Sequence, residues 1–140
     1  MSSANPQRCF SFKSSAFNTS VEREYFINPG CFGDDVARWL ISELRAKGYA
    51  TGEQPDQEDF GWYMTFEVGA AKHDVVIAYR PGSEDGEGEW LFWIERHAGL
   101  VGSIMGKRKN VESEAIEAIQ QTLTSSPIIS SVRVSDQQNL

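Results

Sequence analysis

Hydrophobic residues recur every three or four positions in residues 34–47, DDVARWLISELRAK, and this spacing predicts an amphipathic α-helix. Its buried stripe would consist of Val36, Ala37, Leu40, Ile41 and Leu44. Asp34 and Asp35 suit the positive end of the helix dipole, and Gly48 suits a left-handed C-cap. We expect the rest of the chain to pack against this helix.

Alternating hydrophobic and polar residues predict strands in most of the remaining chain. The predicted strands are residues 8–13, 61–68, 72–80, 89–97 and 128–134. A second helix is expected over residues 110–124, with Asn110 as its N-cap and Pro127 preventing its continuation. Val21 to Ile27 fit either a short strand or a covering arm, and residues 28–30, NPG, predict a turn.

This order of elements predicts an α+β protein, β-α-β-β-β-α-β. We expect a four- or five-stranded, mainly antiparallel sheet with both helices packed on one face. Residues 8–13 would form an edge strand. The length of 140 residues suits one domain, 1–140, with loose tails at 1–7 and 135–140.

Counting strand directions through this order predicts a sheet with oppositely charged ends. The acidic loops 49–59 and 81–89 would meet at the start of the strand 61–68. The opposite end would hold Lys72, the basic run 107–109 and the N-terminus of the first helix.

The net charge of -7, from 13 basic and 20 acidic residues, argues against nucleic acid or an anionic membrane as the main partner. No segment approaches the ~20 apolar residues of a membrane span, and the N-terminus lacks the apolar run of a signal peptide. We therefore expect a cytoplasmic protein in which Cys9 and Cys31 are reduced. A Cys9–Cys31 disulfide is the alternative, but no secretory context favours it.

The two histidines suggest a candidate ligand-binding site. His73 starts one predicted strand and His97 ends the next, so both would lie at the basic end of the sheet. Asp34, Asp35 and Arg96 would lie near them and could support a general base or a metal site. Ordinary surface histidines are the simpler interpretation. Because GxSxG, GxGxxG and EF-hand patterns are absent, we assign no catalytic residue, metal or cofactor.

Aromatic and apolar side chains suggest candidate interfaces. If Tyr63 and Trp93 lie on the sheet face that the helices leave uncovered, a binding groove or a dimer contact is the leading interpretation of that face. Trp62, Trp90 and Trp93 could line a ligand pocket on that face, although tryptophan more often fills a core or an interface. The glycine-rich segment 98–110 is either an exposed contact or a buried turn through its apolar residues Leu100, Val101, Ile104 and Met105.

Several motifs resemble those of a family of small single-domain bacterial proteins of unknown function. The motifs are NPG, FGDDVARWLISELRAKGY, EDFGWYMTFEV, WLFWIE and SSPIISSVRV. The resemblance covers nearly the whole chain, from about Phe10 to Val134. The family theme is an NPG turn, a WL-containing helix ending in glycine, and EDWGW leading into a strand; here Phe60 replaces the usual tryptophan. The resemblance implies a fold and no activity, cofactor or catalytic residue.

We therefore expect a non-enzymatic cytoplasmic protein that acts by protein–protein binding, with an immunity-like or regulatory role. The alternative is a small-molecule-binding protein or enzyme with a pocket near His73 and His97. A homodimer that covers the uncovered sheet face is a third hypothesis.

Overall fold

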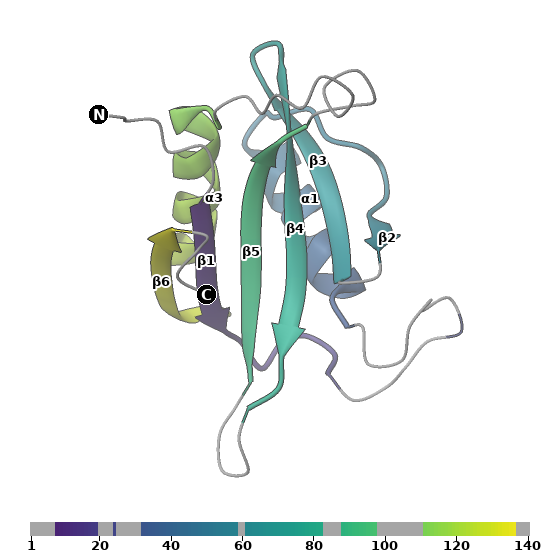
Figure 1. Cartoon of the computed structure of the whole chain (residues 1–140), viewed down its shortest axis with the longest axis vertical. Coiled ribbons are helices and arrows are strands. Elements are labelled where there is room, and N and C mark those ends of the chain that lie inside the picture. The colour runs from purple at the N-terminus through teal and green to yellow at the C-terminus, as the bar shows by residue number, and fades with distance from the viewer. Residues whose placement is uncertain are drawn as a thin grey trace.

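The computed structural model describes residues 8–19, 24, 32–58, 61–82, 88–97 and 111–136. These residues form a six-stranded antiparallel sheet and two helices (Figure 1), so the predicted α+β class is confirmed. The strands are β1 (Arg8–Lys13), β2 (Asp56–Glu58), β3 (Gly61–Val68), β4 (Ala71–Arg80), β5 (Glu89–Arg96) and β6 (Ser130–Asp136). The helices are α1 (Asp34–Ala46) and α3 (Ser113–Ser125).

The strand order is β2-β3-β4-β5-β1-β6. It corrects two predictions: the edge position of residues 8–13 and the number of strands, which is six and not four or five. β1 is an interior strand, because Phe10 is paired with Phe92 of β5 on one side and with Val134 of β6 on the other. β2 was not predicted, since DQE is too short and too polar to show alternation. It forms by pairing with β3, where Asp56 lies opposite Tyr63.

The helices follow their predicted spans with one correction. α1 is followed by Gly48 at φ 98, which confirms the predicted left-handed cap. α3 begins at Ser113 with Glu112 as its N-cap, so the helix starts later than the expected residue Asn110, which lies outside the described residues.

Both helices cover the same face of the sheet, as predicted, and Figure 1 shows them together behind it. One hydrophobic core joins the stripes of α1 and α3 to the inward residues of the strands. The strand residues in this core alternate as the sequence predicts. They include Phe10, Phe12, Trp62, Met64, Phe66, Val75, Ile77, Trp90, Phe92 and Ile94.

α1 runs in the direction opposite to the one predicted. Gly33, before its first residue, lies against Trp62 and Ile77, at the end of the sheet where the β4–β5 connection lies. Tyr49, after its last turn, packs on Phe66 with ring centroids 5.8 Å apart, at the other end. The direction of α1 was predicted wrongly because residues 50–58 were expected to form a loop at the end of the sheet where β3 starts. They run back along β3, from the Thr51–Phe66 bridge to β2.

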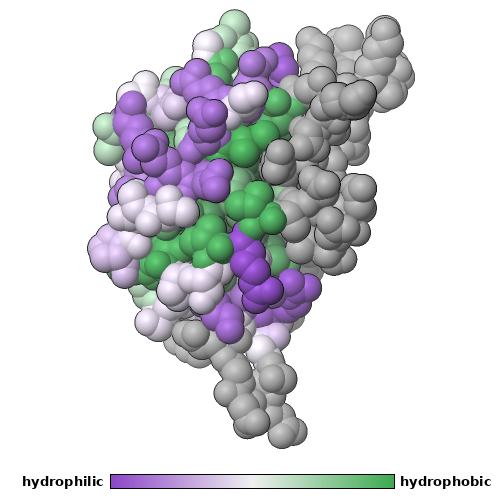
Figure 2. All heavy atoms as spheres, turned by 90° about the vertical axis from the view of Figure 1, so that its left-hand side faces the viewer, coloured by the Kyte–Doolittle hydropathy of each residue, from purple (hydrophilic) through white to green (hydrophobic). Residues whose placement is uncertain are grey.

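The sheet edge formed by β6 carries unusual apolar exposure. Among the described residues, the large hydrophobic side chains that stay well exposed are Ile128, at 39%, and Val134, at 37%. Both belong to the segment that leads into β6 or forms it. Figure 2 views this side of the molecule and shows hydrophobic surface, in green, between hydrophilic residues.

Candidate functional site

The sheet face without helices is the first candidate surface. Strand register places Tyr63, Val76, Trp93 and Cys9 side by side in one row across β3, β4, β5 and β1. Tyr63, Val76 and Trp93 are partly exposed, whereas Cys9 is fully buried. Tyr63 and Trp93 therefore do lie on the helix-free face, which was the condition for interpreting it as a binding surface, but the face is open only in part.

Charged residues are segregated along this helix-free face. At the end near the β3–β4 turn, Glu67, Asp74 and Glu95 outnumber Lys72. Asp74 accepts a hydrogen bond from the Thr65 hydroxyl at 2.7 Å, and His97 Nδ1 lies 3.0 Å from its other carboxylate oxygen. This end of the face is therefore acidic among the described residues, whereas residues 83–87 and the basic run 107–109, on which the predicted polarity also rests, lie outside them.

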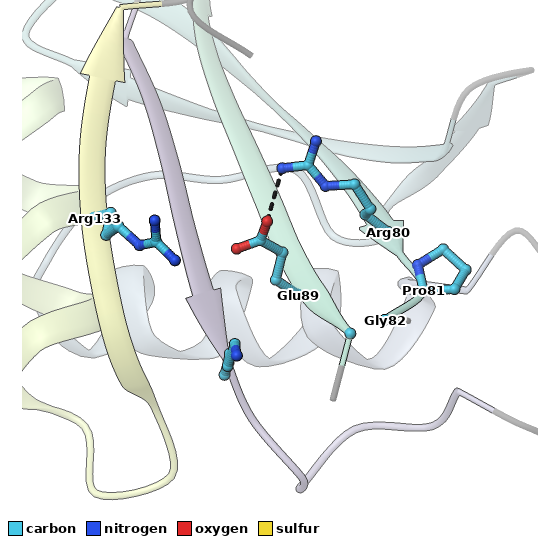
Figure 3. Close-up of a pocket in the computed structure, with 7 residues that line it drawn as sticks. Arg80, Pro81, Gly82, Glu89 and Arg133 are labelled. Carbon is cyan, nitrogen blue, oxygen red and sulfur yellow. Dashed lines mark hydrogen bonds and ion pairs between the residues drawn. The ribbon is translucent and has the colours of Figure 1, made fainter. Parts of the chain in front are cut away.

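The opposite end holds a basic groove, which we define as the hollow lined by Lys13, Arg80, Glu89 and Arg133 together with Pro81, Gly82 and Gly88. Its volume is about 190 Å³. Figure 3 shows Arg133 on β6 and Arg80 on β4 on either side of Glu89 from β5. Arg80 Nη2 donates to Glu89 Oε1 at 2.7 Å.

The described side chains that line the groove carry a net positive charge. Among the described residues, Glu89 is the one acidic side chain that lines it, and its ion pair is with Arg80. Lys13 and Arg133 make no ion pair with any described residue. Two cationic side chains are therefore available to an anionic group in a chain whose net charge is -7.

His73 is a structural residue of the core. It is fully buried, its Nδ1–H donates to the Ala71 carbonyl at 3.2 Å, and its Nε2 accepts the Glu112 backbone N–H at 3.0 Å. This second bond satisfies a free N–H at the start of α3. Burial lowers the pKa of His73 below its usual 6.5, since desolvation disfavours the charged imidazolium, and Arg96 acts in the same direction. Both ring nitrogens are occupied, so neither is free to act as a general base or metal ligand.

We expect the stability of the fold to depend on His73 below pH 6.5. Because the folded state holds this histidine neutral, its stabilisation is complete above 6.5 and is lost as the pH falls toward the lowered pKa. Each unit of lowering corresponds to about 1.4 kcal/mol at acid pH. Urea unfolding between pH 6.5 and about 5, above the range of ordinary carboxyl groups, would measure this slope. His97→Gln should retain the slope and His73→Gln should abolish it; an unchanged slope in His73→Gln would contradict the assignment.

The structure does not bring Asp34 and Asp35 to the histidines. Asp34 and Asp35 lie at the opposite end of the sheet from His73, because Gly33 packs on Ile77, four residues further along β4. That separation is about 13 Å at 3.3 Å per residue. Asp34 pairs with Arg38 at 3.1 Å, and Asp35 accepts the Asn18 backbone N–H at 2.8 Å. The grouping was wrong because it assumed the reversed direction of α1.

Arg96 and His97 stay near His73 with separate partners. Arg96 lies opposite His73 in the β4–β5 register, and its Nη1 is 3.6 Å from Glu112 Oε2. His97 is exposed and faces Asp74. The predicted pocket at this end therefore lacks its buried base and both of its α1 carboxylates.

The structure also places two of the tryptophans and one of the two cysteines. Trp62 and Trp90 belong to the core beneath the helices, so of the two alternatives the core holds and the pocket does not. Cys9 is buried with a free thiol, whereas Cys31 lies outside the described residues. The apolar residues of segment 98–110 also lie outside them: Leu100, Val101, Ile104 and Met105.

The basic groove was missed at the sequence level. Lys13, Arg80 and Arg133 come from three strands, and β6 meets β1 although more than one hundred residues separate them. The alternation of β4 does place Arg80 on the same face as Val76. No local pattern indicates that β6 adds Arg133 to that face.

Comparisons with known protein families, characterised proteins and solved structures find no match. Membership of the bacterial family suggested by the motifs therefore stays a prediction. Among the described residues, no three His, Cys, Asp or Glu side chains are grouped to hold a metal ion. No helix in the described part of the chain is long and apolar enough to cross a membrane.

Proposed function

We propose that this protein acts by binding another protein through its helix-free face, with an acidic side chain of the partner held in the basic groove. The observation that carries the proposal is the pair of cations Lys13 and Arg133, which have no ion-pair partner among the described residues. A carboxylate placed between them would make charge-assisted hydrogen bonds, which are about twice as strong as neutral ones.

The size of the groove favours a protein side chain over a small molecule. Its volume of about 190 Å³ is below the ~300–1,000 Å³ of typical ligand pockets. The row of Tyr63, Val76 and Trp93 lies on the same face, and Trp93 is four residues along β5 from Glu89, about 13 Å away. Aromatic and arginine side chains are enriched at protein interfaces, and this distance falls within one interface of ordinary size.

The segregation of charge along the face supports a defined orientation of the partner. The basic groove lies at one end, and Glu67, Asp74 and Glu95 lie at the other. A partner with the complementary arrangement would be steered into one orientation and would be disfavoured in the reversed one. A regulatory or immunity-like role would require this kind of selective binding and no catalytic group.

Photo-cross-linking in the native cell tests the proposal. Benzoylphenylalanine in place of Trp93 should give a discrete adduct with another protein, and the same group in place of the exposed Gln120 on α3 should not. The adduct yield in lysate should fall as salt rises, because exposed charges are screened beyond about 8 Å at physiological ionic strength.

Charge reversal provides the matched comparison. Arg133→Glu should remove the adduct, whereas Lys47→Glu, the same charge change at an exposed position after α1, should leave it intact. Equal adducts from Arg133→Glu and Lys47→Glu, or no adduct from the Trp93 position, would overturn the proposal.

A further inference from the structure

The two edges of the sheet differ in how well they are protected against further pairing. β2 has only three residues, so it offers little backbone with which another strand could pair. Two of the three are acidic, and charged side chains also oppose pairing at an edge. β6 has seven residues, and its partner β1 lies on one side only. An edge strand of this length presents unpaired backbone N–H and C=O groups along its outer side.

Apolar exposure coincides with this edge. Val134, at 37% exposure, lies within β6, and Ile128, at 39%, lies just before it. Val132 on the same side of the strand is only partly buried. Natural edge strands are commonly blocked by charged residues, above all lysine, by proline or by a bulge. SSVRVSD contains no lysine or proline, its described charged side chain is Arg133, and its irregularity near Ser131 comes before Val132. Within the part of the chain that the structure describes, no strand pairs with the outer side of β6, where Val132 and Val134 lie.

We propose that β6 pairs with β6 of a second copy of this chain, antiparallel and about a two-fold axis, so that the two sheets become continuous. The short, acidic β2 disfavours head-to-tail pairing of β6 with β2, which would form filaments. The symmetric pairing instead closes after two copies.

The register of this pairing follows from the strand itself. Residues that face each other across an antiparallel pair point to the same side of the sheet, so a two-fold axis must pass beside one residue and its own copy. Centring on Arg133 would oppose two like charges, which is unfavourable.

Regular pairing with β1 runs over Arg133–Asp136, and the irregularity near Ser131, whose φ is 55, limits the strand at its start. Residues 132–136 remain for self-pairing, and their centre is Val134. Val134 would then contact its own copy, and Arg133 would lie opposite Ser135.

Solution assembly tests the inference on the full chain under reducing conditions. Sedimentation from micromolar to millimolar concentration should show a monomer–dimer equilibrium for the wild type. Val134→Lys should weaken association by about tenfold or more, because a lysine at an edge strand opposes pairing. Gln121→Lys, on the exposed side of α3, should associate as the wild type does.

Disulfide trapping tests the register. Oxidation of Val134→Cys should give a covalent dimer well above the wild-type background, because cross-strand neighbours have Cβ atoms about 4.5–5.5 Å apart. Arg133→Cys should not, since the two copies of residue 133 would be offset along the strands. A wild type that stays monomeric throughout, a Val134→Lys variant that dimerises normally, or equal trapping at 133 and 134 would overturn the inference. None of these outcomes depends on the cross-linked partner of the helix-free face.

Discussion

Replacing Gly61 with alanine is expected to lower the free energy of unfolding by about 3 kcal/mol or more, the range in which an overpacked site disrupts its surroundings. Gly61 is buried at the start of β3 with φ +157, and an added Cβ would overlap the carbonyl oxygen of Ile77 on β4. Because the obstacle is backbone, no side-chain rotation can relieve the overlap. β3 and β4 would have to separate at the end of the sheet against which α1 begins.

Urea unfolding of Gly61→Ala would measure this loss as a lower midpoint. Gly52→Ala is the matched control, since the nearest atom to its added Cβ is the Gln54 carbonyl oxygen at 4.0 Å. That variant should stay within about 0.5 kcal/mol of the wild type, as surface substitutions usually do. A Gly61→Ala variant as stable as Gly52→Ala would contradict the close approach of β3 and β4.

Local alternation was sufficient to divide the residues of β3, β4 and β5 between two faces, but not to say which face the helices cover. Trp62, Met64 and Phe66 face the helices and Tyr63 faces away, as the period of two requires. The same period of two also predicts that His73 is buried. His73 shares the parity of Val75 and Ile77, so its burial followed from the pattern, and a surface role did not.

Long-range pairing could not be predicted in the same way. RCFSFK alternates equally well as an edge or an interior strand, and its position in the sheet depends on β5 and β6, which lie far along the chain. Residues 50–58 carry no strand pattern and become ordered along β3 because that strand offers a free edge. The second error reversed the predicted direction of α1 and so wrongly placed Asp34 near His73, whereas the first concealed the groove at Arg133.

Replacing Phe92 with alanine is expected to cost about 3–5 kcal/mol, the usual range for a fully buried aromatic residue. Phe92 is completely buried at the centre of β5, and its ring meets Phe12 edge-on with centroids 5.0 Å apart. Domains of this kind are stable by about 5–15 kcal/mol, so the loss is a large share of the total. Thermal unfolding should show the melting temperature falling by roughly 10 °C.

The neighbouring residue on β5 supplies the control. Trp93 points to the helix-free face and is partly exposed, so Trp93→Ala should cost only about 1–2 kcal/mol although it removes the larger side chain. The protein-binding proposal needs this difference, because a residue at a protein interface must be replaceable without unfolding the domain. Equal losses from Phe92→Ala and Trp93→Ala would mean that both faces of β5 are core, leaving Trp93 no surface with which to bind a partner.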